Sequence, residues 1–312
     1  MFRRSALAAA GVAAAFTLSG CAAFSNAPSR PDDGSIDVVA AFYPLQYVAD
    51  RVGGDLITVT DVTRPGQEPH DLELSPKQTA QVALADLVVY EKGLQASVDA
   101  ATTQSGAVLV DAGRVAGLEP MSHGGHDDAG ADHGEEEGAG ELDPHFWQDP
   151  LKLAAVGEAV ATKLGDLDPA HRATYLENAA ALRADLTDLD HEYATGLAHC
   201  ERHTIVVSHN AFGYLSRYGL DVEPIAGLSP DAEPTPADLA RLHALIASDH
   251  ITTVFGERLA PAQLARTLAS DAGVTTAVLD PIEGLTDQTS TDDYLSLMRA
   301  NLTALKKANA CH

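Results

Sequence analysis

The sequence predicts an α/β protein with two lobes, each a parallel sheet flanked by helices, joined by one long rigid linker helix. Three observations support this fold class. Short apolar, β-branched runs alternate with segments of helical periodicity from Ile36 onward, which is typical of parallel sheets with crossover helices. This alternation occurs in two blocks of similar size. A single apolar stripe of unusual length lies between the two blocks.

Composition and charge exclude several classes of protein. The chain has 312 residues, of which 45% are hydrophobic, so it is long enough for two domains of ordinary size. Its 20 Lys and Arg residues stand against 45 Asp and Glu, and the formal charge is −25. Such an acidic chain lacks the basic footprint that nucleic acids require, so we expect no nucleic-acid partner. No window holds the roughly 18 uninterrupted apolar residues typical of a membrane-spanning helix. We expect a monomer.

The N-terminal segment has the pattern of an export signal. Two arginines precede an Ala-rich apolar stretch at residues 5–18, which is too short to span a bilayer comfortably. Residues 1–20 are therefore predicted to be a signal peptide. The Leu-Ser-Gly-Cys motif that ends at Cys21 resembles a bacterial lipobox, so Cys21 is predicted to carry a lipid; a plain secretory signal is the alternative. Residues 21–35 would then be a flexible tether, and the protein would be extracytoplasmic (periplasmic or on the cell surface), anchored by lipid alone.

Export also determines the chemistry of the two remaining cysteines. With Cys21 lipidated, Cys200 and Cys311 are left, and an unpaired thiol is unusual outside the cytoplasm. We therefore predict a disulfide between Cys200 and Cys311. A thiolate metal site is the alternative, although neither cysteine lies in a Cys-x-x-Cys pair.

Residues 36–165 form the predicted N-terminal lobe. Its helix at residues 75–84 has Ser75 as N-cap and Pro76 at the first helical position. Its strands are short runs rich in Val, Ile and Leu, as expected for buried parallel strands. In chain order the predicted elements are strand 36–42, helix 45–52, strand 56–62, helix 75–84, strand 87–90, helix 94–103 and strand 108–110.

The linker helix is assigned to residues 166–199. Asp168 is its predicted N-cap and Pro169 its first helical residue. Apolar residues then recur at steps of three or four, which places them on one face of a helix. A helix of this length between two lobes would act as a stiff strut. The residues of the stripe are Tyr175, Ala179, Leu182, Leu186, Leu189, Tyr193 and Leu197.

Residues 200–312 form the predicted C-terminal lobe, in which the alternation resumes. The helix at residues 236–248 has Thr235 as its expected cap. In chain order the predicted elements are strand 204–208, helix 211–218, strand 222–225, helix 236–248, strand 251–255, helix 262–272, strand 275–279 and helix 294–308.

Residues 122–140 interrupt the pattern of the N-terminal lobe. They have no apolar periodicity and consist mostly of Gly, His, Asp and Glu. His123, His126 and His133 lie among these acidic residues. One hypothesis is a low-affinity antenna, in which these imidazoles and carboxylates capture a metal ion such as zinc or accept it from a metallochaperone. The alternative is a solvated acidic linker that tolerates histidine.

Four residues at strand ends or in apolar-flanked loops are the candidate metal ligands: His70, His145, His209 and Asp280. Ligand sites of α/β sheets lie beyond the carboxyl ends of strands, so these side chains are expected to converge. Three imidazoles and one carboxylate would complete a four-coordinate zinc site. Ligands rich in nitrogen suit zinc, copper or nickel better than manganese or calcium.

Two further carboxylates are weaker candidates. Glu68 shares a loop with His70, and Glu257 follows a predicted strand of the second lobe. Either could ligate the metal directly. A supporting role beside a ligating histidine is more common for such carboxylates, because ligating histidines usually donate their other N–H to a carboxylate or a carbonyl.

The four motifs together resemble a known family. They are Pro-Gly-Gln-Glu-Pro-His ending at His70, Asp-Pro-His-Phe-Trp around His145, His-Asn-Ala-Phe-Gly-Tyr from His209, and Leu-Asp-Pro around Asp280. In this order they are similar to the cluster A-I metal-binding solute proteins of ABC transporters, specifically the ZnuA-like zinc branch. The resemblance covers essentially the whole chain after the signal peptide. It implies a zinc-binding lipoprotein that delivers Zn²⁺ to an ABC permease.

The resemblance also implies the ligand set and leaves alternatives. Residues matching His70, His145 and His209 bind the metal in that family, and Asp280 matches a fourth ligand that water replaces in some zinc members. Manganese members commonly have Glu at the third position, so His209 favours zinc. Uptake of manganese or of a broad range of metals remains the main alternative.

Catalysis is the less favoured class of function. A catalytic zinc site keeps one position open for water, whereas three histidines and Asp280 would close the coordination sphere. The chain lacks the His-Glu-x-x-His, Gly-x-Ser-x-Gly and phosphate-loop motifs. We therefore predict that it is not an enzyme. A secreted zinc-dependent hydrolase and an adhesin with structural zinc remain the alternatives.

Overall fold

The computed structural model describes residues 35–121, 141–230 and 232–312. The predictions for the signal peptide, the tether and Cys21 concern residues outside these ranges. The same is true of the histidine-rich segment with His123, His126 and His133. No helix within the described ranges is both long and apolar enough to cross a membrane.

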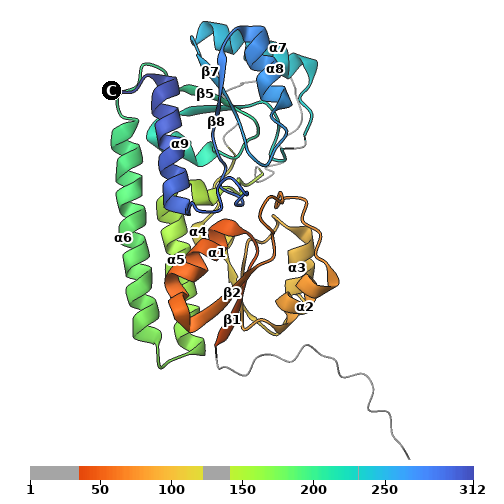
Figure 1. The fold of residues 1–312 in the computed structure, drawn as a ribbon, viewed down its shortest axis with the longest axis vertical. Helices are drawn as coiled ribbons and strands as arrows, with labels where there is room; N and C mark the ends of the chain where they lie inside the picture. The colour runs from red at the N-terminus through yellow and green to blue at the C-terminus, as the bar shows by residue number, and fades with distance from the viewer. Residues whose placement is uncertain (1–34, 122–140, 231) are drawn as a thin grey trace, which may run out of the picture. The chain divides into compact units, whose positions relative to one another are not determined.

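The N-terminal lobe contains a four-stranded parallel sheet with the strand order β2-β1-β3-β4 (Figure 1). All four predicted strands are present, and β3 is buried along its whole length. The helix after β2 begins as predicted, because the Ser75 hydroxyl accepts from the Gln78 N–H and the Gln78 side chain accepts from the Ser75 N–H. The elements are β1 (Ile36–Ala40), α1 (Tyr43–Gly53), η1 (Gly54–Leu56), β2 (Ile57–Asp61), α2 (Pro76–Leu84), β3 (Leu87–Tyr90), α3 (Ala96–Thr102), β4 (Val108–Asp111) and α4 (Ala112–Ala116).

The C-terminal lobe repeats this topology in its own parallel sheet, with the order β6-β5-β7-β8. In each sheet the strand order reverses between the two central strands, and ligands of such sheets bind beyond the carboxyl ends at that point. The helix predicted at residues 211–218 is instead a short 3₁₀ helix. The elements are β5 (Thr204–Val207), η3 (Gly213–Tyr218), β6 (Asp221–Pro224), α7 (Pro236–Ser248), β7 (Thr253–Gly256), α8 (Gln263–Ala272), β8 (Thr275–Val278) and α9 (Tyr294–Asn309).

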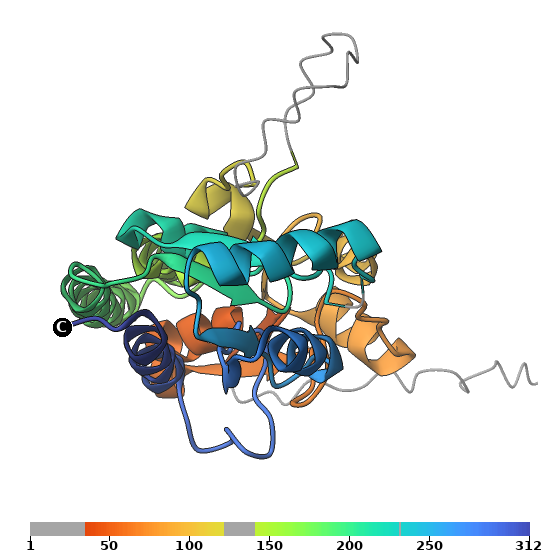
Figure 2. The ribbon, with the colours of Figure 1, turned by 90° about the horizontal axis from the view of Figure 1, so that it is seen from above.

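Two long helices, rather than one, connect the sheets. η2 (Phe146–Gln148) leads into α5 (Pro150–Leu167), which is absent from the predicted elements, and α6 (Arg172–Gly196) returns beside it (Figure 1). The apolar stripe predicted for the linker helix is confirmed, because its members on α6 are buried. Figures 1 and 2 show α9 alongside α6, so the linker also packs against the C-terminal lobe.

The predicted start of the linker helix is wrong. Asp168 ends α5 instead, where its N–H donates to the Leu164 carbonyl. A residue before proline is pushed out of the helical region, and Pro169 has no N–H to continue the ladder. The Asp168 carboxylate then accepts from His171 Nδ1 at 2.6 Å and from the Tyr175 hydroxyl at 3.0 Å, which fixes the turn into α6.

One continuous cluster of buried apolar side chains spans both lobes. It runs from the N-terminal sheet through α1, α5 and α6 to β5, η3 and α9. A smaller, separate cluster lies under α7 and α8 in the C-terminal lobe, and its largest members are Val206, Ile225, Leu242, Ile246, Ile251, Val254 and Leu268. The core therefore joins the N-terminal lobe to the near side of the C-terminal lobe, and leaves α7 and α8 on a core of their own.

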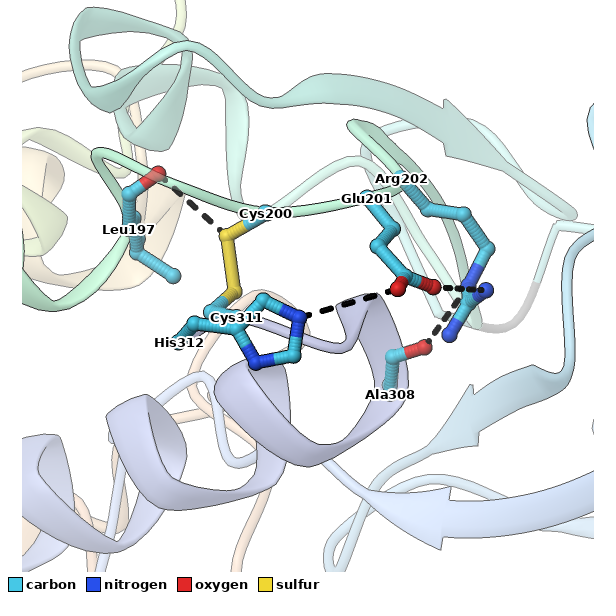
Figure 3. Close-up of a disulfide and its surroundings, with 7 residues drawn as sticks. All are labelled: Leu197, Cys200, Glu201, Arg202, Ala308, Cys311 and His312. Atoms are coloured by element: carbon cyan, nitrogen blue, oxygen red, sulfur yellow. Dashed lines mark hydrogen bonds and ion pairs between the residues drawn. A yellow bond between two sulfur atoms is a disulfide. The ribbon is translucent and has the colours of Figure 1, made fainter.

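The predicted disulfide between Cys200 and Cys311 is present in the structure (Figure 3). The two residues also pair as an antiparallel bridge, and the His312 N–H donates to the His199 carbonyl at 3.0 Å. The disulfide therefore ties the end of α9 to the segment that leaves α6.

Candidate metal centre

Three imidazoles predicted as ligands meet between the two sheets. His70 lies in the loop after β2, His145 directly precedes η2, and His209 follows β5. His145 and His209 are fully buried, and the His70 side chain is 12% exposed. The Nε2 atoms of His70 and His145 are 3.3 Å apart. Segments distant in sequence thus place three nitrogen ligands in one small volume.

The carboxylate beside these imidazoles is Glu283, not Asp280. Glu283 Oε1 lies 3.4 Å from Nε2 of each of His70, His145 and His209. The four ligand atoms lie within 4.8 Å of one another, and within the described ranges this is the group of His, Cys, Asp and Glu side chains arranged to hold a metal ion. The assignment of Asp280 as the fourth ligand is therefore corrected to Glu283.

Asp280 is not part of this group, and each of its carboxylate oxygens accepts a hydrogen bond from another residue. Its Oδ1 accepts from the Ile282 N–H at 2.9 Å, and its Oδ2 accepts from Arg258 Nε at 3.0 Å. Asn301 on α9 holds the same loop from behind, accepting from the Asp280 N–H at 2.9 Å and donating to the Asp280 carbonyl at 2.6 Å. Asp280 thus shapes the turn that presents Glu283.

The turn itself explains why sequence reasoning selected the wrong carboxylate. Ile282 has a φ of 62°, which is rare for a β-branched residue and redirects the chain just before Glu283. The Leu-Asp-Pro motif marks the loop correctly, but nothing in its residue types shows this reversal. Glu283 was available as a nearby acidic residue in an apolar loop, and that is the only signal the sequence offered.

Each buried imidazole is oriented by a carboxylate at its other nitrogen. His145 Nδ1 lies 2.8 Å from Asp143 Oδ1, and His209 Nδ1 lies 2.7 Å from Glu257 Oε1. With Nδ1 as the donor, Nε2 of each ring faces the centre with its lone pair when the ring is neutral. Glu257 therefore has the supporting position considered for it, while Asp143 is a supporting residue that the sequence analysis missed.

Glu68 lies at the edge of the centre. Its Oε1 is 4.0 Å from His70 Nε2 and has no hydrogen-bond partner among the described residues. Its Oε2 accepts from the Asp71 N–H at 3.3 Å. Glu68 is therefore close enough to influence His70 but is not one of the four grouped ligands.

Hydrogen bonds to backbone carbonyls connect the ligand loops of the two lobes. The Gly66 N–H, in the loop of His70, donates to the Leu285 carbonyl at 2.7 Å, in the loop of Glu283. Trp147 Nε1 and Gln148 Nε2 both donate to the Pro281 carbonyl, at 2.8 and 2.6 Å. The loops that carry the ligands are therefore fixed to each other as well as to their own sheets.

Electrostatics in the centre favour ionised Glu283 beside protonated histidine when no metal is bound. Burial by itself raises the pKa of Glu283, but its interactions with the three imidazoles outweigh burial and hold that pKa well below its ordinary value. For His209, burial lowers the pKa, yet the carboxylates of Glu257 and Glu283 raise it to about 10. Burial also lowers the pKa of His145, but Asp143 and Glu283 produce a net rise.

The spacing of the imidazole nitrogens around Glu283 Oε1, and of the His70 and His145 nitrogens from each other, fits a tetrahedral metal ion. Zinc binds nitrogen and carboxylate oxygen at about 2.0–2.2 Å, which implies an edge of about 3.4 Å between tetrahedral ligands. The distances of 3.3 and 3.4 Å around Glu283 Oε1 and between the His70 and His145 nitrogens match that edge. His209 Nε2, moreover, is buried without a hydrogen-bond partner among the described residues. A buried polar atom without a partner is costly, and a metal ion would supply the missing interaction.

A profile of the family described as "zinc-uptake complex component A periplasmic" matches residues 38–308. This chain belongs to that family. The zinc-binding lipoprotein AdcA of Streptococcus pneumoniae R6 is 36% identical over 294 residues, covering 92% of this chain and 59% of the relative. The high-affinity zinc uptake system protein ZnuA of Bacillus subtilis 168 is 35% identical over 309 residues, covering 95% of each chain.

Solved structures show the same two-lobe fold. The laminin-binding protein of Streptococcus agalactiae, described as a bifunctional protein with adhesin and metal transporting activity, superposes with a TM-score of 0.77 at 28% identity. The match covers 88% of this chain and 99% of that one. The predicted family and fold class are thereby confirmed, while this chain spans about three-fifths of the length of the pneumococcal relative (59%).

Proposed function

We propose that this chain is the extracytoplasmic zinc-binding component of an ABC transporter for zinc uptake. In this proposal His70, His145, His209 and Glu283 bind one Zn²⁺ as cargo between the two lobes. Asp143 and Glu257 orient two of the imidazoles. The observation that carries the proposal is the grouping of three imidazole nitrogens, each 3.4 Å from the Glu283 carboxylate.

Four protein ligands favour binding over catalysis. A catalytic zinc site needs an open position at which water is activated, whereas this centre offers four candidate protein ligands. Membership of a zinc-uptake family and the names of the relatives support the same conclusion. The chain therefore acts, in this proposal, by holding and releasing the metal unchanged.

The remaining parts of the transport role are also part of the proposal. A lipid on Cys21 would anchor the protein at the outer face of the cytoplasmic membrane, where the loaded form docks on a permease. The histidine-rich segment with His123, His126 and His133 would capture zinc or accept it from a metallochaperone. Because one core joins the linker helices to both lobes, release would come from local movement of the ligand loops and of the part under α7 and α8.

The test is a competitive titration of the metal-stripped protein with Zn²⁺ against a chromogenic chelator, repeated with Mn²⁺. We expect one tight zinc site and much weaker Mn²⁺ binding. His209→Ala should weaken zinc binding by about three orders of magnitude or more, since it removes a ligand and leaves the carboxylates of Glu257 and Glu283 without their partner. Tighter Mn²⁺ than Zn²⁺ binding would make this a manganese or broad-range uptake protein.

Adhesion is a second candidate function, supported by the likeness to the bifunctional laminin-binding protein. A chain with that activity would bind immobilised laminin when loaded with zinc. Surface plasmon resonance with and without a chelator tests this directly. Absence of binding at micromolar protein concentrations would leave zinc uptake as the one proposed function.

A further inference from the structure

A cavity of about 290 Å³ lies beside the metal centre, with His70 in its wall. Residues of both lobes line it, including Leu118 in the N-terminal lobe and Leu228 in the loop after β6. Leu94, Leu142 and Pro144 add to its apolar lining. A cation that left or reached the centre on the side of His70 would therefore cross a largely apolar space.

One ionisable side chain in this wall has no hydrogen-bond partner in the described part of the chain. Glu91 directly follows β3, so it lies at the carboxyl end of a central strand, and it is 2% exposed. Both of its carboxyl oxygens are buried, and neither has a hydrogen-bond partner among the described residues. A Cβ at Gly113 would come within 3.2 Å of Glu91 Cγ, so the absent side chain of Gly113 provides the space in which Glu91 packs.

Such a carboxyl group requires an explanation. A buried polar group that makes no hydrogen bond destabilises the fold, and structures retain few of them. Burial, followed by the negative charges of Asp111, Asp143 and Asp99, raises the pKa of Glu91 well above its ordinary value. The group therefore keeps a proton when no other cation is near, and a divalent cation in the cavity would replace that proton.

We propose that Glu91 is a carboxylate ligand of a second, transient divalent-cation site in this cavity, through which Zn²⁺ passes between solvent and the three imidazoles. The proposal rests on the proposed function, because it concerns the route to the same centre. Glu141, which is exposed, lines the same cavity and adds a second carboxylate, while Lys92 adds one positive charge. A carboxylate oxygen binds zinc, but with lower affinity than three imidazoles and a carboxylate together. The ion would therefore bind transiently at Glu91 before it reaches or leaves the imidazoles.

The test compares rates with affinity. Zinc association is followed by stopped-flow mixing of Zn²⁺ with the metal-stripped protein, and release by mixing the loaded protein with excess chelator. For Glu91→Gln we expect both rates to fall at least tenfold, while the Kd from the competitive titration changes less than threefold. Glu177→Gln is the matched control, because it removes one exposed carboxylate on α6 and should leave both rates within twofold of those of the unmodified chain.

Three other results would overturn the proposal. Unchanged rates for Glu91→Gln would show that Glu91 is only a neutral buried group. A Kd raised a hundredfold would place Glu91 in the tight site itself. An unmodified chain without tight zinc binding would overturn the proposed function as well, and that result needs no variant. If Glu91→Gln shows no cooperative thermal unfolding, Glu141→Gln and Glu91→Asp replace it. Glu141→Gln should slow both rates. Glu91→Asp keeps a carboxylate and should slow both rates less than Glu141→Gln does.

Discussion

Asp280 and Glu283 share one short loop, yet only Glu283 faces the imidazoles. The Asp280 oxygens are held by Ile282 and Arg258, whereas Glu283 Oε1 lies 3.4 Å from three Nε2 atoms. The two carboxylates therefore have different surroundings: Asp280 is bonded within its own turn and to Arg258, and Glu283 lies among the imidazoles that we propose bind zinc. Their separate substitution tests whether their roles differ.

Glu283→Ala is expected to weaken zinc binding by a factor of about 10³ or more, because it removes a ligand from a buried centre. Asp280→Ala should weaken zinc binding by about 10–100-fold, the range typical of residues that orient ligands. Both values come from the competitive chelator titration. An Asp280→Ala variant that loses more affinity than Glu283→Ala would show that Asp280 ligates the metal after all.

Protonation of the histidines predicts how zinc affinity depends on pH. Zinc needs neutral imidazole, but Glu257 and Glu283 raise the pKa of His209 to about 10 in the metal-free protein. The protonated ring stabilises the metal-free fold below its unfolded pKa, and this contribution is lost as pH rises through the folded value. Zinc affinity should therefore keep rising with pH between 7 and 9, well above the ordinary pKa of histidine.

The measurement is isothermal titration calorimetry at pH 7.5 in buffers with different ionisation enthalpies. We expect release of at least one proton for each Zn²⁺ bound, because a charged His209 must lose its proton. Glu257→Gln should reduce this release, since it removes one of the two carboxylates that hold the proton. Binding without net proton release would contradict the assignment.

At the scale of elements, α9 supports the metal centre from a distance. Its Asn301 makes two hydrogen bonds to the backbone of Asp280, and its Tyr294 hydroxyl donates to the Trp147 carbonyl at 2.5 Å. The disulfide and the hydrogen bond from Arg202 Nε to the Ala308 carbonyl fasten the far end of the same helix (Figure 3). The helix thus links a covalent tie at one end to the Glu283 loop near the other.

Removal of the disulfide should lower stability more than affinity. Its cysteines are 111 residues apart, and a disulfide typically stabilises a fold by about 2–4 kcal/mol. In urea unfolding, the double variant Cys200→Ser, Cys311→Ser should lose about that much free energy of unfolding. Its Kd for zinc should stay within about fivefold of that of the unmodified protein. In the unmodified protein both thiols should resist labelling until a reductant is added, and free labelling of the native protein would refute the bridge.

At the scale of the whole molecule, the hydrophobic core does not depend on the metal. The larger cluster joins β1, β3, α5, α6 and α9 without using the centre as its link. A protein whose zinc is only cargo should stay folded when empty, whereas an adhesin with structural zinc should unfold. The arrangement of the core predicts the first behaviour.

Circular dichroism and thermal melting after treatment with a chelator check this prediction. The metal-free protein should keep its helical signal and melt cooperatively. Zinc at about 100 times its Kd should add about 2.7 kcal/mol to the free energy of unfolding, which corresponds to a rise in Tm of about 5–10 °C. Loss of the helical signal on metal removal would instead indicate structural zinc.

The sequence alone determined the fold class, the family and three of the four residues that the structure brings together as candidate ligands. Strands and helices each repeat their apolar residues at a characteristic spacing, which can be read from the sequence. Ser75 and Pro76 mark the start of a helix through contacts within one turn. His70, His145 and His209 could be selected because each stands in a short motif at a strand end or in an apolar-flanked loop. Local patterns of this kind are visible in sequence because the interactions that produce them are local.

Only the tertiary structure decided which carboxylate lies among the imidazoles, the pairing of α5 with α6, and the lack of a hydrogen-bond partner for Glu91 within the described residues. Each depends on contacts between segments far apart in the chain. Arg258 and Asn301 hydrogen-bond Asp280, and α6 packs on α5. Glu91 is buried beside a cavity that both lobes line. The left-handed turn at Ile282 also follows from this packing, since its own side chain disfavours it. Nonlocal packing, and not residue type, determines which of two neighbouring carboxylates lies among the three imidazoles.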